Sequence, residues 1–364
     1  MNKTQELLAE GQSIWYDNIQ RKLLENGELA GMIERGEIRG VTSNPSIFMN
    51  AVTKSSDYDA SLAPLAEKGL GTEDIFFHLA VEDIQAAADL FAPLYQQSNG
   101  ADGYVSLEVS PRLAHDTAGT LAEAKRLWQW VNRPNLMVKI PATVAGLPAI
   151  TEAIAEGINV NVTLIFSRER YGEVMEAHAA GLEKRMARGL PIDKIESVAS
   201  FFISRMDSAI DPRLQSMGSA EASALMGKAA IANACLAYAD FKEMINSERF
   251  QKILAGGGKL QRPLWASTST KNPSYRDVIY VEELIGPNTV NTVPPQTLTA
   301  FLDHGVVRRS LDEDVAGAGQ TMDNLEALGI SLKQVTAQLE AEGVKAFIDA
   351  FDVLLDAIRS RLAG

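Results

Sequence analysis

Residues 136–141 (LMVKIP) decide the fold, because they place one lysine in an otherwise apolar strand. Side chains alternate between the two faces of a strand, so Val138 and Ile140 share one face and Lys139 lies on the other. Pro141 cannot donate a hydrogen bond to a sheet, so we expect the strand to end there. Burial disfavours the charged form of an amine, and a neutral amine is the nucleophile that Schiff-base enzymes need. The stretch predicts a reactive lysine near the carboxyl end of a buried strand.

Seven further strand-like runs lie on either side of this one and alternate with longer helical patterns. The expected strands are 13–19, 39–44, 103–109, 135–140, 158–165, 195–203, 262–268 and 288–293. The expected helices include 73–97, 116–131, 168–188 and 219–246, where apolar residues recur three and four apart. This alternation predicts a single (β/α)8 TIM barrel over residues 1–364, and a doubly wound open sheet is the alternative. Extra helices are expected at 1–12 and 333–361, and 50–72 as an excursion between strands two and three.

Polar side chains share one parity in several of the expected strands. Glu108 alternates with apolar neighbours in 103–109, as do Asn161 and Thr163 in 158–165. Parallel strands covered by helices are apolar outward, so the polar parity must point into the barrel. A packed core does not tolerate so many polar groups without a polar ligand or water. The residues expected to converge on the barrel mouth are Asp17, Asn44, Glu108, Lys139, Asn161, Thr163 and Ser200.

These residue types form a coherent set for carbonyl chemistry. Attack of the Lys139 amine on a ketone gives a carbinolamine and then an iminium ion, which lets a neighbouring carbon–carbon bond break. Glu108 is the candidate acid/base for dehydration, through a water held by Thr163, and Asp17 for the hydroxyl beside the breaking bond. Asn44 and Asn161 are candidates for hydrogen bonds to the substrate's hydroxyl groups.

The composition narrows the class of protein. With 364 residues, 46% of them apolar and 22% charged, the chain is typical of a globular protein. A net charge of -13 argues against a broad nucleic-acid or anionic-membrane surface. The single Cys235 excludes an internal disulfide, and residues 1–20 lack the apolar core of a signal peptide, so we expect a cytoplasmic enzyme. Four histidines without metal-ligand spacing, and no GxGxxG after a strand, predict neither a metal nor a nicotinamide cofactor.

Two long runs resemble the signatures of the transaldolase family, GVTSNPSIF (40–48) and LMVKIPATVAGLPAI (136–150). The resemblance covers roughly residues 10–305 and extends to Asp17, Glu108 and the pair Asn161 and Thr163. It implies a Schiff base on Lys139 and transfer of a dihydroxyacetone unit in the non-oxidative pentose phosphate pathway. The implied donor is sedoheptulose 7-phosphate and the implied acceptor glyceraldehyde 3-phosphate, giving erythrose 4-phosphate and fructose 6-phosphate.

The resemblance also implies a phosphate site at the ends of the later strands. Ser200 and Arg205 match the family pattern in 197–207, and Ser267 matches it in 264–275. Where other transaldolases carry an arginine two residues after that serine, this chain has Ser269. Lys271 is the candidate replacement, as a point charge without the planar fork of arginine.

Other interpretations remain open from the sequence. Glu108 could be a structural partner of Arg112, and Arg205 could pair with Asp207 or Asp211. An aldolase that releases free dihydroxyacetone is the nearest rival, although those relatives tend to carry glutamine at Glu108 and tyrosine at Phe202. A sugar-phosphate binding protein without turnover is the rival from another class, and the chain could act as a monomer or a homodimer.

Overall fold

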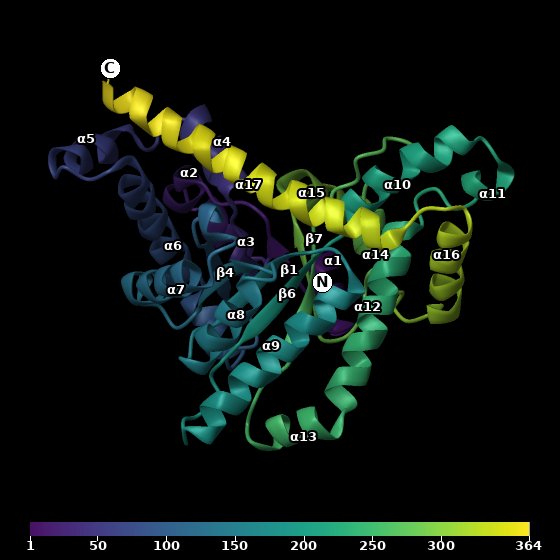
Figure 1. The fold of residues 1–364 in the computed structure, drawn as a ribbon. Coiled ribbons are helices and arrows are strands. Elements are labelled where there is room, and N and C mark those ends of the chain that lie inside the picture. Colours follow the sequence, from purple (N-terminus) through teal and green to yellow (C-terminus); the bar gives the residue numbers. More distant parts are fainter. Residues whose placement is uncertain (364) are drawn as a thin grey trace.

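The computed structural model describes residues 1–363 and contains a closed barrel of eight parallel strands, hydrogen-bonded in chain order (Figure 1). The strands are β1 (Gln12–Tyr16), β2 (Gly40–Val41), β3 (Tyr104–Glu108), β4 (Leu136–Pro141), β5 (Val160–Ile165), β6 (Ser197–Phe202), β7 (Gln261–Ala266) and β8 (Thr289–Val293). The predicted TIM barrel is confirmed, and closure excludes the open-sheet alternative. Residue 364, the last of the predicted domain, lies outside the described residues.

Helices surround the barrel and cross one of its ends. They are α1 (Lys3–Ala9), α2 (Arg21–Glu25), α3 (Glu28–Glu34), α4 (Pro45–Lys54), α5 (Asp59–Glu67), α6 (Thr72–Gln97), η1 (Pro111–Leu113), α7 (Thr117–Val131), α8 (Gly146–Ala155), α9 (Arg168–Ala187), α10 (Ser204–Met217), α11 (Ala220–Ser223), α12 (Ala229–Asn246), α13 (Glu248–Ala255), α14 (Ile279–Glu282), α15 (Pro295–His304), α16 (Val315–Ala327) and α17 (Leu332–Ala363). No helix among residues 1–363 has the length and apolar composition needed to cross a bilayer.

The register of the strands brings the key residues to one level of the barrel. Lys139 of β4 lies opposite Glu108 on β3 and opposite Asn161 on β5. Five register pairs between β1 and β8, from Gln12 with Thr289 onward, close the ring. The carboxyl ends of all eight strands therefore surround one opening, which is where TIM-barrel active sites form.

Two expected elements differ from the structure. The strand expected at 39–44 has only two paired residues, because the chain leaves the sheet and Asn44 caps α4 by accepting from the Ile47 amide at 3.0 Å. The helix expected at 219–246 is broken between α11 and α12. Gly227 lies in this break with φ +70°, and its amide donates to Asp211 Oδ1 at 3.0 Å. A residue in the left-handed conformation interrupts a right-handed helix, and glycine adopts that conformation readily.

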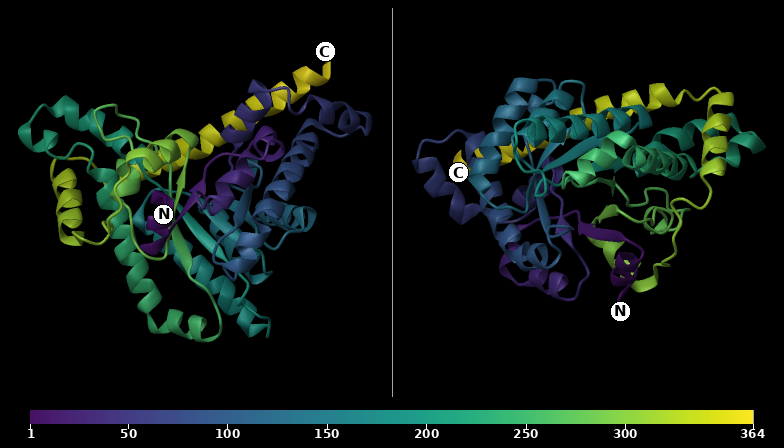
Figure 2. Two further views of the ribbon diagram at one scale, coloured as in Figure 1. Left: turned by 180° about the vertical axis from the view of Figure 1, so that it is seen from behind. Right: turned by 90° about the horizontal axis from the view of Figure 1, so that it is seen from below.

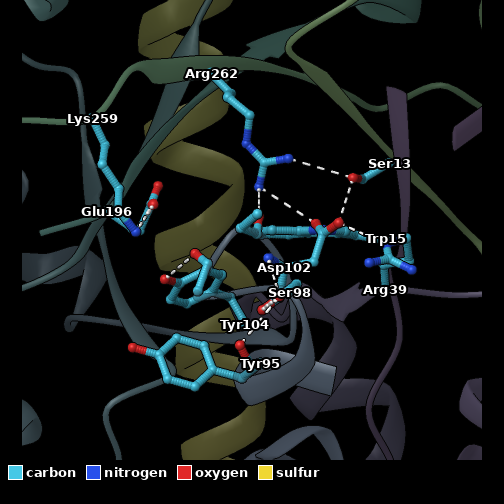
Figure 3. Close-up of polar contacts among 12 residues, drawn as sticks. Ser13, Trp15, Arg39, Tyr95, Ser98, Asp102, Tyr104, Glu196, Lys259 and Arg262 are labelled. Atoms are coloured by element: carbon cyan, nitrogen blue, oxygen red, sulfur yellow. Dashed lines mark hydrogen bonds and ion pairs between the residues drawn. The ribbon is translucent and has the colours of Figure 1, made fainter. Parts of the chain in front are cut away.

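A buried carboxylate ties together the opposite, amino-terminal end of the barrel (Figure 3). Asp102 precedes β3 and accepts hydrogen bonds from Ser13 Oγ at 2.7 Å and Trp15 Nε1 at 3.1 Å. Arg39 Nε donates to it at 2.6 Å, and Arg262 Nη2 lies 3.4 Å away. These partners come from β1, β7 and the segment before β2. One side chain therefore connects β1 and β7, the two strands that flank β8 in the closed barrel.

Helix α17 crosses the other end of the molecule as one long element (Figures 1 and 2). It packs on α4 at one side of the barrel and on α10 at the other, and it also contacts β5. The closing helical stretch expected at 333–361 is therefore the single helix α17, which covers the carboxyl ends of the strands, and α16 precedes it outside that range.

Replacement of Asp102 by alanine should lower the free energy of unfolding by about 3–5 kcal/mol, because two mostly buried arginines lose their counter-charge. Urea denaturation followed by circular dichroism measures the loss. The control is Asp89→Ala, which removes an exposed ion pair with Arg133 and should cost about 1 kcal/mol or less. Equal losses in the two variants would show that the Asp102 cluster does not stabilise the barrel.

Candidate active site

A cavity of about 250 Å³ opens at the carboxyl ends of the strands. Seven of the ten predicted site residues line it, namely Asp17, Asn44, Lys139, Ser200, Arg205, Ser267 and Lys271. Glu108, Asn161 and Thr163 do not line the cavity but lie behind its wall. A larger hollow of about 520 Å³ lies among α9, α12, α16 and α17, and none of the predicted residues lines it.

The Lys139 amine is held on the barrel side by two groups. Its Nζ donates to the Ser43 carbonyl at 3.0 Å and lies 3.5 Å from Glu108 Oε2. Lys139 is 4% exposed and Glu108 is 7% exposed, so the pair is screened from bulk water. Arg112 pairs instead with Glu73 and Asp352, so the interpretation of Glu108 as its structural partner is wrong.

Burial is the main influence on the Glu108 carboxyl. It raises the pKa of Glu108 to about 7, although the nearby Lys139 charge acts in the opposite direction and Asp17 raises it further. Oε2 has no hydrogen-bond partner among the described residues. A carboxyl with a pKa near neutrality can both donate and accept a proton at physiological pH.

Asp17 follows directly after β1 and faces the same cavity from the other side of the barrel. Its Oδ1 accepts from the Thr42 hydroxyl at 2.6 Å. Burial raises the pKa of Asp17, whereas the Lys139 charge, the Thr42 hydrogen bond and the Lys271 charge lower it. Two carboxyls with raised pKa values therefore flank the lysine from different strands.

A chain of hydrogen bonds links the wall of the cavity to the residues behind it. Ser200 Oγ donates to Asn161 Oδ1 at 2.7 Å, and Asn161 Nδ2 donates to Ser106 Oγ at 3.0 Å. Asn161 is fully buried, so it reaches the cavity through Ser200. Thr163 is also fully buried, and its hydroxyl has no partner among residues 1–363. It lies beside a bulge in β5, where the register with β6 shifts.

The part of the cavity wall that follows β6 and β7, here called the cationic wall, carries two cations, Arg205 and Lys271. Arg205 and Lys271 have no ion-pair partner among residues 1–363, and burial lowers the pKa of each. The Arg205 charge lowers the pKa of Lys271 further. Ser267 follows β7 directly and lines the same cavity. Its backbone has φ +56°, and its hydroxyl is 3.0 Å from that of Ser204. Lys271 is exposed and Arg205 is partly buried, so two cations without an ion-pair partner among the described residues, together with a strained serine, suit an anionic ligand.

The interpretation that Arg205 pairs with Asp207 or Asp211 is wrong. Asp207 accepts from the Tyr280 hydroxyl at 2.6 Å, and Asp211 accepts from the Tyr275 hydroxyl at 2.7 Å. Both tyrosines belong to the segment after β7 that carries Lys271. The two carboxylates of α10 therefore hold that segment beside Arg205.

Sequence analysis missed several residues that line the cavity. Thr42 holds Asp17, and its place in the run GVTSN could have revealed it as a polar residue at the end of β2. Phe347 lies on α17, far along the chain, and no local pattern connects it with the barrel mouth. Among residues 1–363, no three His, Cys, Asp or Glu side chains gather in a way that could hold a metal ion.

The fold and the cavity define an enzyme of the TIM-barrel class, with its site at the carboxyl ends of the strands. Residues 14–358 match the family model described as transaldolase/fructose-6-phosphate aldolase. A transaldolase of Saccharopolyspora erythraea is 52% identical over 99% of this chain and 98% of that protein. One of Mycolicibacterium smegmatis is 50% identical, over 98% and 96%, and one of Thermobifida fusca is 48% identical, over 99% and 98%. The chain belongs to the transaldolase/fructose-6-phosphate aldolase family.

The raised pKa of Glu108 predicts a specific dependence of stability on pH. The ordinary value for glutamate is 4.5, so between pH 4.5 and about 7 the folded state holds a proton that the unfolded state has lost. Stability therefore decreases as pH rises through this range. The wild type should lose up to about 3 kcal/mol relative to Glu108→Gln between these pH values, measured by urea denaturation. Parallel profiles for the two proteins would contradict the raised pKa.

Proposed function

We propose that this chain is a transaldolase that moves a dihydroxyacetone unit from sedoheptulose 7-phosphate to glyceraldehyde 3-phosphate, through a Schiff base on Lys139. Family membership and the full-length relatives named transaldolase support transferase activity of this kind. The observation that carries the mechanism is the buried pair of Lys139 and Glu108, 3.5 Å apart beside a polar cavity.

The first half of the reaction attaches the donor to the enzyme. The Lys139 amine adds to the ketone carbon, and the resulting carbinolamine loses water to give an iminium ion. Glu108 donates the proton that lets the hydroxyl leave, through a water held at Thr163. Its pKa near 7 suits this role, because the group can return to its starting state within one cycle.

The second half breaks and remakes a carbon–carbon bond. Asp17 accepts the proton of the hydroxyl beside the breaking bond, so that erythrose 4-phosphate leaves as an aldehyde and the bonding electrons move to the iminium nitrogen. The resulting enamine attacks the aldehyde carbon of glyceraldehyde 3-phosphate, and Asp17 returns its proton to the new hydroxyl. Water then releases fructose 6-phosphate from Lys139. Asn44, together with Ser200 and Asn161, orients the sugar hydroxyls.

The phosphate of each sugar is proposed to bind at the cationic wall. Arg205 and Lys271 supply the charge, and Ser267 supplies a hydroxyl. The family resemblance implies an arginine at the position of Ser269. Lys271, two residues further along the chain, would supply a point charge in place of the planar guanidinium group of arginine.

Cytoplasmic location is a further proposal, supported by the single, free and buried Cys235. Sugar phosphates are the proposed partners. The proposed assembly is a monomer or a homodimer.

Incubation with fructose 6-phosphate followed by borohydride reduction should add the mass of a reduced sugar or three-carbon fragment to Lys139, located by peptide mass spectrometry. Addition of erythrose 4-phosphate should give sedoheptulose 7-phosphate, whereas a dihydroxyacetone-releasing aldolase would give free dihydroxyacetone. Lys259→Arg is the matched control and should still form the adduct on Lys139. Lys259 also pairs with a glutamate, at 2.7 Å, but it lies near the amino ends of the strands (Figure 3). Glu108→Gln should slow Schiff-base formation roughly 10²–10⁴-fold.

The absence of an adduct on Lys139 would contradict the Schiff-base mechanism. Turnover close to normal in Glu108→Gln would give that residue a structural role.

Lys271→Ala should raise KM for glyceraldehyde 3-phosphate roughly 10- to 100-fold, the effect of one lost charge-assisted hydrogen bond, with a much smaller change in kcat. Steady-state kinetics with unphosphorylated glyceraldehyde as the acceptor provide the internal comparison, since that acceptor should show no such change. Lys68→Ala removes an exposed lysine and serves as the charge control. Equal losses with both acceptors would contradict the phosphate assignment.

A further inference from the structure

Phe347 of α17 lies over the reactive end of Lys139. The Lys139 Nζ is 5.8 Å from the centre of the Phe347 ring, within the range of a cation–π contact. Phe347 is 4% exposed and lines the same cavity as Lys139, Asp17 and Arg205. The ring is therefore part of the wall around the nitrogen, and it comes from outside the barrel.

Close packing fixes the position of α17 on both sides of this ring. One turn earlier, a Cβ added to Gly343 would lie 3.1 Å from Leu164 Cδ2 and 3.4 Å from the Phe166 ring, so the helix backbone lies against the end of β5. One turn later, Phe351 makes an edge-to-face contact with Phe76, with ring centres 5.4 Å apart. Phe347 therefore has little freedom to move away from Lys139.

The contacts of Nζ divide into two sides. The Ser43 carbonyl and the Glu108 carboxyl approach it from the barrel wall, and the ring covers it from the side of α17. Phe202, which is 7% exposed, lines the cavity on the β6 side, where its ring contacts Arg205. A water molecule approaching the nitrogen from the side of α17 would have to displace the Phe347 ring.

We propose that Phe347 is a positioning residue that decides whether the three-carbon fragment is transferred or released, by keeping water from the fragment on Lys139. This inference rests on the proposed function. Release requires a proton on the enamine carbon, which restores an iminium ion. One water oxygen then bonds to the iminium carbon, the C–N bond breaks, and dihydroxyacetone leaves with the amine restored. Transfer uses the enamine carbon on an aldehyde instead, so a site that admits no water from the side of α17, beyond the one proposed at Thr163, favours transfer at this stage.

The test is the ratio of free dihydroxyacetone released to sedoheptulose 7-phosphate formed, with fructose 6-phosphate as the donor and erythrose 4-phosphate as the acceptor. Phe347→Ala leaves space for a few water molecules at about 30 Å³ each, and it should raise this ratio about tenfold or more. Phe347→Leu retains most of the apolar cover and should raise it less. The same order should appear in the rate of dihydroxyacetone release when no acceptor is present.

Leu354→Ala is the matched control for weaker packing of α17, because Leu354 is fully buried on the same helix but does not line the cavity. Its ratio should equal that of the wild type. Thermal unfolding checks that each variant is folded, and Phe347→Leu provides the measurement if Phe347→Ala does not fold. An unchanged ratio in the folded Phe347 variants, or an equal rise in Leu354→Ala, would overturn the inference. Wild type that forms neither adduct nor transfer product would instead contradict the proposed function.

Discussion

Hydrogen bonding between β1 and β8 closes the barrel, and the cavity takes its shape from this closure. Asp17 follows β1 and Lys271 follows β7, yet both face Lys139 of β4, on the far side of the ring. In an open sheet the edge strands would diverge and these side chains would not meet. The amino-terminal end supports the same closure, because Asp102 connects residues of β1 and β7 within one buried cluster (Figure 3).

Within the ring, the Lys139 charge opposes the effect of burial on the Glu108 carboxyl. Burial favours a neutral carboxyl, the lysine charge favours an ionised one, and the result is a pKa near neutrality. A fully exposed glutamate would be ionised at pH 7, and an isolated buried one would stay protonated. The register that places Lys139 opposite Glu108 therefore also brings the pKa of this carboxyl toward neutrality.

Two patterns in the sequence were enough to predict the barrel: strand-like runs alternate with helical ones, and polar side chains fall on one face of several strands. Both patterns depend on local periodicity. They also identified Lys139 and Asp17 as facing one cavity, whereas Asn161 lies behind Ser200 and does not line that cavity. The short β2 could not be predicted, since Asn44 leaves the strand to cap a helix. Phe347 could not be predicted either, because its place depends on how a distant helix packs, and that packing has no periodic signature.

The position of α17 at the end of the chain also affects how the protein is made. All eight strands precede residue 294, so a growing polypeptide can in principle close its barrel before Phe347 has been synthesised. At translation rates of about 5–20 residues per second, the interval between the last strand and this ring is several seconds. During that time Lys139 is present in a barrel mouth that α17 does not yet cover. Biosynthesis therefore completes the strand that carries Lys139 first and the helix that covers it last.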